Sequence, residues 1–157
     1  MNTYVIDSNS LIRLGQFYPS RFPTLWQSID ILVASGRLIS VKECVAEIES
    51  FHKDDAIKTW VKAHSKIFMP PTASEAIMVG EILKIPHFRS LISEVALLKG
   101  RPVADPFLVA SAAVKRAIVV TEELEKPQAA KVPNVCKHFG VNFLTLEQMM
   151  ELENIGY

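Results

Sequence analysis

Hydrophobic residues follow two different periods along the chain. Short β-branched runs, such as residues 3–6 and 117–120, are typical of strands that are buried on both faces. Longer segments with apolar residues three and four positions apart are typical of amphipathic helices. The pattern predicts strands at residues 3–6, 38–40, 117–120 and 141–144, and helices at residues 11–14, 25–33, 41–48, 54–61, 75–83, 88–98, 107–115, 134–139 and 145–153.

Local signals at the ends of these segments support the boundaries. Gly36 stands where the glycine that ends a helix belongs, and Pro86 and Gly140 end two further helices. Thr145 is a favourable N-cap for the last helix. The polar and basic residues 124–132 predict an exposed loop.

A few short strands alternate with many helices. Parallel strands need crossover connections, which are usually helices, so this alternation predicts an α/β protein with a short parallel sheet and helices on both faces. Ligands of such sheets bind beyond the carboxyl ends of the strands. Residues that directly follow a strand are therefore the first candidates for a functional site.

The composition narrows the class of protein. With 157 residues, 49% of them hydrophobic, we expect a single folded domain over residues 1–157. Lys and Arg total 17, as do Asp and Glu, so the net charge is zero and any contact with a polyanion must come from a local patch. Residues 1–6 do not resemble a signal peptide and no apolar run could span a membrane, which predicts a cytoplasmic protein. Cys44 and Cys136 are expected to be reduced core thiols.

Several common functional motifs are missing from the sequence. It has no phosphate-binding loop, no dinucleotide-binding glycine motif and no serine-hydrolase elbow. The four histidines lack the spacing of a zinc site. Carboxylates are therefore the remaining candidates for chemistry.

Two of the five aspartates stand at junctions that the fold class places at the same edge of the sheet. Asp7 follows the first strand, and Asp105 precedes the helix at residues 107–115. Each also has a structural interpretation. Asp7 can cap a helix, and Asp105 before Pro106 is typical of an N-cap with proline at the first helical position.

Three glutamates are further candidates. Glu47 lies on the same helical face as Glu43, where the two like charges repel unless a cation intervenes. Glu122 and Glu123 follow the strand at residues 117–120, although a solvated turn is the simpler local explanation. Carboxylates that converge on one sheet edge need a counter-charge, and oxygen ligands favour Mg²⁺ or Mn²⁺. Such a site is suited to phosphodiester hydrolysis.

Four segments, in order, resemble motifs of the PIN-domain family. Each contains an acid that matches the family pattern: Asp7 after the first strand, Glu47 before an aliphatic residue in a helix, Asp105 at the start of a helix and Glu123 at the end of a strand. The segments are residues 4–12 (YVIDSNSLI), 40–48 (SVKECVAEI), 104–112 (ADPFLVASA) and 119–123 (VVTEE), and residues 131–141 are similar to one PIN-like subgroup.

This resemblance implies a three-layer α/β/α PIN-like fold and a metal-dependent ribonuclease. The same four acids would hold Mg²⁺ or Mn²⁺ and form the catalytic site, with Glu123 in a supporting role. Asn9 and Thr121 would orient ligands or water. Many small single-domain members are toxins of the VapC type, so the resemblance also implies RNA as substrate, a cognate antitoxin protein and a homodimer.

Two features depart from the family pattern. Glu123 replaces the usual Asp, and its extra methylene can displace that ligand, in which case Glu122 is the substitute. The neutral net charge disfavours RNA binding, so a local rim of basic residues is needed. Its candidates are Arg13, Arg21, Lys115, Arg116, Lys126 and Lys131.

Two other functions stay open. A phosphatase similar to the haloacid dehalogenases also has an Asp nucleophile after its first strand, but those enzymes need a second Asp where this chain has Asn9. A PIN-like module that binds RNA or protein without cleaving it would keep the carboxylates in an incomplete cleft.

Overall fold

The computed structural model describes residues 1–51, 55–92 and 103–156. Within them, five short parallel strands form one sheet in the order β3-β2-β1-β4-β5. In the register of the central strand, Tyr4 lies opposite both Leu38 and Ile118. The strands are β1 (Tyr4–Ile6), β2 (Leu38–Val41), β3 (Phe68–Met69), β4 (Ile118–Val120) and β5 (Phe143–Leu144).

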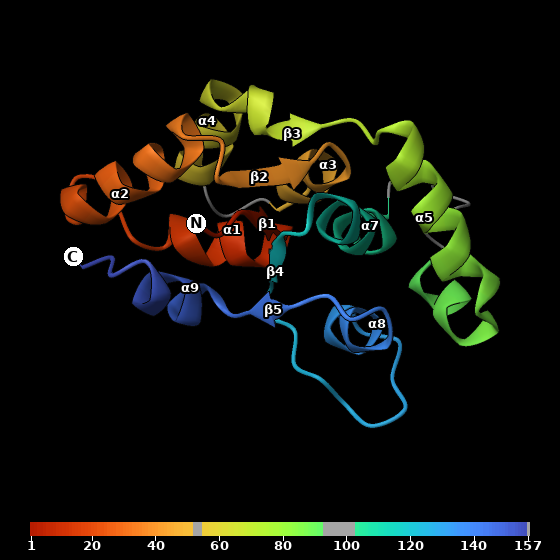
Figure 1. Cartoon of the computed structure of the whole chain (residues 1–157). Coiled ribbons are helices and arrows are strands. Elements are labelled where there is room, and N and C mark those ends of the chain that lie inside the picture. Colours follow the sequence, from red (N-terminus) through yellow and green to blue (C-terminus); the bar gives the residue numbers. More distant parts are fainter. Residues whose placement is uncertain (52–54, 93–102, 157) are drawn as a thin grey trace.

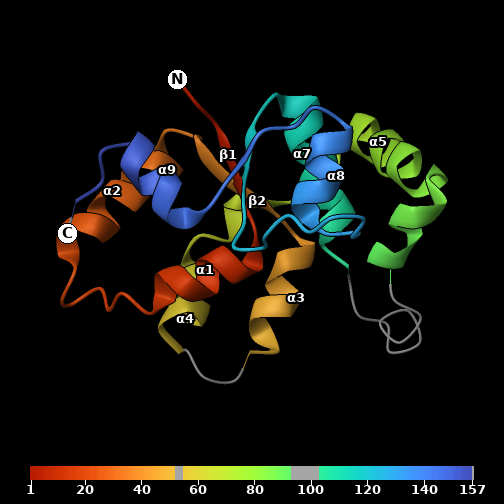
Figure 2. The same cartoon turned by 90° about the horizontal axis from the view of Figure 1, so that it is seen from below.

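Helices cover both faces of the sheet and give the molecule three layers (Figures 1 and 2). In Figure 2, α5, α7 and α8 lie on one side of β1 and β2, and α1, α2, α4 and α9 lie on the other. The predicted α/β class with a parallel sheet between helices is therefore confirmed. The helices are α1 (Ser8–Gly15), α2 (Pro23–Ala34), α3 (Glu43–Glu49), α4 (Asp55–Ala63), α5 (Ala73–Lys84), α7 (Asp105–Lys115), α8 (Val132–His138) and α9 (Leu146–Leu152), with short 3-10 helices η1 (Ser65–Ile67) and η2 (Pro86–Leu91).

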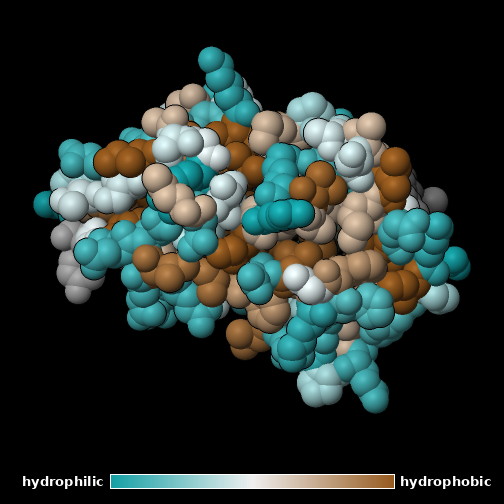
Figure 3. Space-filling view, in the orientation of Figure 1, coloured by the Kyte–Doolittle hydropathy of each residue, from teal (hydrophilic) through white to brown (hydrophobic). Residues whose placement is uncertain are grey.

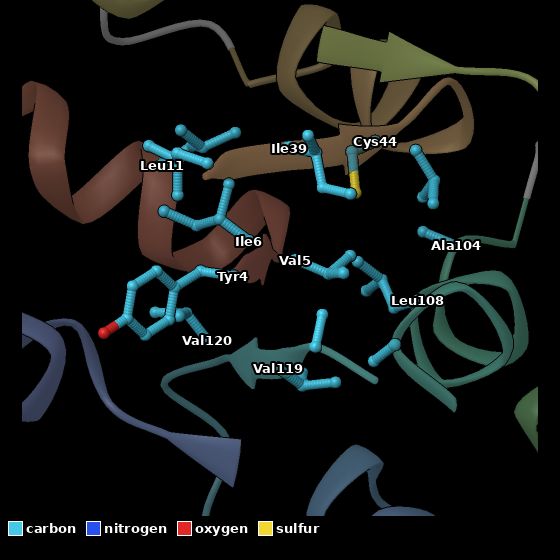
Figure 4. Packing of buried hydrophobic residues seen from close by; sticks show 14 of the residues in the cluster. Tyr4, Val5, Ile6, Leu11, Ile39, Cys44, Ala104, Leu108, Val119 and Val120 are labelled. Atoms are coloured by element: carbon cyan, nitrogen blue, oxygen red, sulfur yellow. The ribbon is translucent and has the colours of Figure 1, made fainter. Parts of the chain in front are cut away.

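The side chains of β1 are completely buried and join the sheet to both helical layers. Figure 4 shows Val5 beside Leu108 of α7, and Ile6 on the side of Leu11 of α1. Full burial of an aliphatic side chain contributes about 1.5–3 kcal/mol to folding. Because Asp7 directly follows β1, this core fixes the position of that aspartate.

Two helix ends follow the local sequence signals. Gly36 has a φ angle of +72°, and its N–H donates to the carbonyl of Val33 at 3.0 Å, which ends α2. The Thr145 hydroxyl accepts a 3.2 Å hydrogen bond from the backbone N–H of Gln148, whose side chain accepts a 2.9 Å bond from the N–H of Thr145. This reciprocal capping box begins α9 as the threonine predicts.

Other boundaries differ from the sequence prediction. The first helix begins at Ser8 instead of residue 11, because Asp7 caps it. The helix predicted from residue 41 begins at Glu43, since β2 extends through Val41. The sequence pattern does not predict β3, whose two residues are too few to show a period.

Two predicted elements are shorter where the structure describes them. The strand predicted at residues 141–144 contains only Phe143–Leu144. The helix predicted at residues 88–98 is the 3-10 helix Pro86–Leu91, and residues 93–98 lie outside the described residues. Asp54, at the predicted start of α4, also lies outside them.

No helix within the described residues is long and apolar enough to cross a lipid bilayer.

Candidate functional site: a carboxylate cluster at the ends of β1 and β4

Four acidic residues from four different elements meet at the carboxyl ends of β1 and β4. Asp7 follows β1, Glu47 lies on α3, Asp105 begins α7 and Glu123 follows β4. In the sheet, β1 has β2 on one side and β4 on the other, so the strand order reverses between β1 and β4. Ligands of parallel sheets bind at such a reversal, beyond the carboxyl ends of the strands. Figure 2 shows the end of β1 leading into α1, with α3 below the strands. We call these four residues the carboxylate cluster.

Asp7 is the most deeply buried member of the cluster, with 2% of its surface exposed. Its Oδ1 accepts a 2.7 Å hydrogen bond from the backbone N–H of Ser8, and its Oδ2 accepts a 2.9 Å bond from the Thr121 hydroxyl. Burial raises the pKa of Asp7 to about 6; the negative charges of Glu47 and Glu123 add to this rise, and the two hydrogen bonds oppose it. Asp7 is therefore both the cap of α1 and an acid with an unusually high pKa.

Ser8 connects two acids of the cluster. Its hydroxyl lies 3.3 Å from Oδ1 of Asp7 and also hydrogen-bonds Oε2 of Glu47. The other oxygen of Glu47 accepts a 3.3 Å bond from the backbone N–H of Ala104, at the N-cap of α7. The sequence pattern does not predict this role of Ser8. The only sequence signal for it is its place directly after Asp7 in the segment that resembles PIN domains.

Asp105 is the first residue of α7, and Ala104 occupies the N-cap position without a side-chain cap. The interpretation of Asp105 as the N-cap is therefore wrong. Burial raises the pKa of Asp105 to about 8, and the charges of Asp7, Glu123 and Glu47 act in the same direction. Lys131 partly opposes the rise. The charges of all three other acids therefore act on Asp105.

Glu122 and Glu123 face different surroundings although they are adjacent in sequence. The carboxylate of Glu122 accepts hydrogen bonds from Arg13 at 3.1 Å and from the backbone N–H of Leu146 at 2.9 Å, so it ties α1 to α9. Glu123 accepts a 2.9 Å bond from the N–H of Val132, and its charge acts on both aspartates of the cluster. Glu123 therefore shares the electrostatic environment of Asp7 and Asp105, whereas Glu122 joins α1 to α9.

Asn9 and Thr121 form a polar support beneath the cluster. The Asn9 amide lies 3.3 Å from the Thr121 hydroxyl, and its carbonyl oxygen accepts a 3.1 Å bond from the N–H of Glu122. The Thr121 hydroxyl in turn donates to Asp7. Asn9 therefore contacts Thr121, and Thr121 contacts Asp7; the orienting role of both residues toward a ligand or water stays a prediction. The amide of Asn9 does not supply the second acid that a haloacid-dehalogenase-like phosphatase needs at this position.

Glu43 and the two cysteines are not members of the carboxylate cluster. Glu43 is 7% exposed and faces the charge of Glu75 on α5, so it does not share the environment of Glu47. Cys44 and Cys136 are free and buried, as predicted. Burial, with the charge of Asp7, raises the pKa of the Cys44 thiol well above its ordinary value. A protonated thiol is a poor metal ligand, so oxygen atoms dominate the donor set.

Only some of the basic residues that the sequence predicts as a rim lie near the carboxylate cluster. Arg13 pairs with Glu122, and Lys115 pairs with buried Glu75 at the far end of α7, roughly 15 Å along the helix axis from Asp105. Arg116 follows Lys115 and shares that remote position, because α7 runs from the carboxyl to the amino edge of the sheet. Lys131 is exposed and lies near enough to lower the pKa of Asp105.

The donor chemistry of the cluster matches a hard divalent cation. Its acids supply only oxygen atoms. Burial, with the added repulsion of the neighbouring acids, raises the pKa of both aspartates, and a bound cation would favour their ionised forms. Among the described residues, however, no three His, Cys, Asp or Glu side chains already stand in a metal-binding arrangement. Two of the carboxylates are held instead by backbone N–H groups, Glu47 by Ala104 and Glu123 by Val132. A carboxylate that accepts one such bond keeps lone pairs for a metal, so these bonds orient Glu47 and Glu123 and do not exclude either as a ligand.

The comparison with known proteins gives the family of the chain. Residues 4–157 match the family described as "Domain of unknown function (DUF4411)", so the chain belongs to that family. No curated protein sequence matches the chain.

Proposed function

We propose that the chain is a metal-dependent endoribonuclease that hydrolyses RNA phosphodiester bonds at the carboxylate cluster and leaves a 5′-phosphate and a 3′-hydroxyl. The observation that carries this proposal is the meeting of four acids from separate elements at one sheet edge. There, burial and the added charge of the neighbouring acids raise the pKa of Asp7 and Asp105. Buried like charges are costly unless a cation compensates them. Strongly perturbed acids in such a position are typical of functional sites.

The roles of the residues follow from their surroundings. Asp7 and Asp105 would hold Mg²⁺ or Mn²⁺, joined by Glu47 and Glu123. The bound ion would lower the pKa of water, the nucleophile, and stabilise charge on the phosphate oxygens. Thr121 and Ser8 hold the two oxygens of Asp7 in fixed directions through hydrogen bonds. Lys131 is exposed beside Asp105 and would contact a substrate phosphate.

The resemblance to PIN domains supports a more specific role. We propose a cytoplasmic toxin that acts on RNA, forms a homodimer and is neutralised by a cognate antitoxin protein. Expression should then arrest growth, and co-expression of a neighbouring open reading frame should relieve the arrest. If expression of the active wild type does not arrest growth, the toxin role is wrong, and the nuclease proposal still stands.

A cleavage assay tests the nuclease directly. Wild type and Asp7→Asn are incubated with a panel of labelled RNAs, tRNA included, in Mn²⁺, Mg²⁺ or EDTA. Asn is nearly as good an N-cap as Asp, so the variant should fold while losing a charged ligand. Glu49→Gln, which changes an exposed acid on α3, is the matched control. Cleavage that needs metal, is kept in the control and is lost in Asp7→Asn supports the proposal; equal cleavage by both variants overturns it.

One observation favours a second candidate, a module that binds RNA or protein without cleaving it. Glu47 and Glu123 already accept hydrogen bonds from Ala104 and Val132. If the acids keep the present arrangement, in which no three His, Cys, Asp or Glu side chains of the described residues converge on one metal position, the cluster does not hold the metal that cleavage needs. RNA bound with equal affinity in Mg²⁺ and EDTA, and never cut, would favour this function.

A further inference from the structure

A pocket beside the carboxylate cluster lies between the start of α3 and the start of α7. Its cavity measures about 480 Å³, which is enough for a flat ring system the size of a nucleobase and more than a single ion needs. Two of its residues stand on either side of Ala104 and Asp105, so the pocket adjoins the cluster. The described residues that line the pocket are Lys42, Glu43, Val103 and Phe107.

Glu43 carries an unpaired polar atom in the wall of this pocket. The residue is 7% exposed, and its Oε2 has no hydrogen-bond partner within the described parts of the chain. Burial raises the pKa of Glu43 and the charge of Glu75 adds to this rise, whereas its own N–H and the charge of Lys42 oppose it. A buried oxygen without a donor costs free energy, so a ligand that supplies N–H donors would stabilise the pocket.

Exposed hydrophobic surface does not by itself mark a site in this molecule. Figure 3 shows hydrophobic side chains reaching the surface in patches among hydrophilic ones, as on most proteins. Phe107 differs because it lines the same pocket as the unpaired oxygen. Its side chain is half-buried, and it belongs to none of the ring pairs found among the described residues. An aromatic ring in a pocket wall is suited to stack against a flat ligand.

The charge of Lys42 favours a nucleotide over a simple cation as the ligand. Lys42 is exposed, lines the pocket next to Glu43 and has no ion pair within the described ranges. Its ammonium group would repel a cation and attract a phosphate.

The carboxylate of Glu43 distinguishes among the RNA bases. Guanine presents two adjacent donors, N1–H and the 2-amino group, which match the two oxygens of a carboxylate. Adenine and cytosine place an acceptor beside their amino donor, and uracil has an acceptor on each side of its N3–H. Each of these three bases would therefore bring a lone pair against a carboxylate oxygen.

We propose that this pocket binds a guanine base of the RNA and so selects a nucleotide close to the scissile phosphate. Glu43 would accept hydrogen bonds from N1–H and the 2-amino group, Phe107 would stack on the base, and Lys42 would contact a phosphate. Glu43 precedes Glu47 by four residues on α3, a rise of roughly 6 Å, which one nucleotide spans. The selection of a cleavage site rests on the proposed function, but binding of the base does not require cleavage.

Titration of the full chain with mononucleotides in EDTA, followed by NMR, tests the pocket without cleavage. We expect GMP to bind roughly tenfold or more tightly than AMP, CMP and UMP. Inosine monophosphate keeps N1–H but lacks the 2-amino group, so it should bind more weakly than GMP. Glu43→Gln should lose the preference for GMP, because its amide presents one acceptor oxygen in place of two. Glu49→Gln, an exposed acid of the same helix, is the matched control and should keep the preference.

A second variant separates stacking from recognition of the base edge. Phe107→Leu should weaken the binding of all four nucleotides by a similar factor, because every base has a face that can stack. Thermal unfolding of each variant shows whether its fold is kept. No binding of GMP to wild type at millimolar concentration, equal affinity for the four nucleotides, or an unchanged preference in folded Glu43→Gln would overturn the proposal.

Cleavage of a random RNA pool in Mn²⁺, with sequencing of the cut ends, separates this proposal from the proposed function. Cuts at a fixed distance from guanine in wild type, and without that preference in Glu43→Gln, support both. Cleavage by wild type that ignores guanine would overturn the selection of a nucleotide and leave the nuclease. Binding of GMP that depends on Glu43, with no RNA cut, would support the guanine pocket and count against the nuclease.

Discussion

The Thr121 hydroxyl donates a 2.9 Å hydrogen bond to Oδ2 of Asp7, which precedes it by 114 residues in sequence. This bond joins the carboxyl ends of β4 and β1 at the position where the strand order reverses. It also stabilises the ionised form of an acid whose pKa burial raises to about 6. Thr121 therefore keeps the most buried acid of the cluster closer to its charged state.

Replacement of Thr121 by Val should remove this hydrogen bond while keeping the shape of the side chain. We expect the pKa of Asp7 to rise further above about 6, because the hydrogen bond lowers it. The loss should cost about 1 kcal/mol of unfolding free energy above that pKa. NMR titration of the Asp7 carboxyl measures the change. Thr24→Val, at an exposed position of α2, is the control, and an unchanged Asp7 pKa in Thr121→Val would contradict the account.

Replacement of Asp105 by Asn should stabilise the protein in the absence of metal. The pKa of Asp105 is raised to about 8, so the folded state holds a proton that the unfolded state loses near pH 4. Stability from this group is thus fully present below about pH 4 and is lost as the pH rises toward about 8. Asp105→Asn should therefore unfold several degrees higher than wild type at about pH 8 in EDTA, with little difference at about pH 4.

Thermal unfolding at both pH values tests this sign. Glu49→Gln, an exposed acid with the same change of charge, should leave the unfolding temperature within a degree or so of wild type at either pH. A lower unfolding temperature for Asp105→Asn at the higher pH would show that Asp105 is not under electrostatic strain.

The two neighbouring glutamates should respond differently to the same substitution. Glu122→Gln weakens the contacts with Arg13 and the N–H of Leu146 and should cost about 1–2 kcal/mol of unfolding free energy. Glu123→Gln should change stability less and should lower metal affinity and RNA cleavage, because Glu123 belongs to the carboxylate cluster. Urea unfolding and the cleavage assay, run on both variants, separate these roles; the reverse pattern would make Glu122 the ligand.

A second acid, far from the cluster, should govern stability at low pH. Burial raises the pKa of Glu153, but hydrogen bonds from Arg37 and the Tyr4 hydroxyl outweigh it, so the pKa lies below its ordinary value. Its contribution is present above the ordinary pKa and is lost as the pH falls through the lowered one. Glu153→Gln should cost about 1 kcal/mol near neutral pH and progressively less in acid. Glu151→Gln, on the exposed face of α9, should show no such dependence in acid unfolding.

The sequence supplies the class of fold and much of the candidate site. Asp7 and Glu123 follow buried strands and Asp105 begins a helix that leads into one, so the rule that ligands bind beyond strand ends selects them. The buried β-branched runs of β1 and β4 also predict which strands are central. These are local signals, and they need no knowledge of distant contacts.

Other features depend on tertiary contacts that no local pattern reveals. Ser8 lies between Asp7 and Glu47 only because α1 and α3 pack together. Lys115 is predicted beside the cluster from its charge, but the direction of α7 carries it to the opposite edge of the sheet, where it meets Glu75. Sequence spacing alone does not give that direction.

The proposed function requires that the carboxylate cluster binds a divalent cation. Calorimetric titration of the protein with Mn²⁺ near neutral pH, without RNA, measures this binding. We expect Mn²⁺ to bind saturably to wild type and to Glu49→Gln, and its affinity to fall roughly tenfold or more in Asp105→Asn. Binding should also release protons, because the metal displaces the proton held by Asp105. No binding to wild type, or equal binding to Asp105→Asn, would contradict the account.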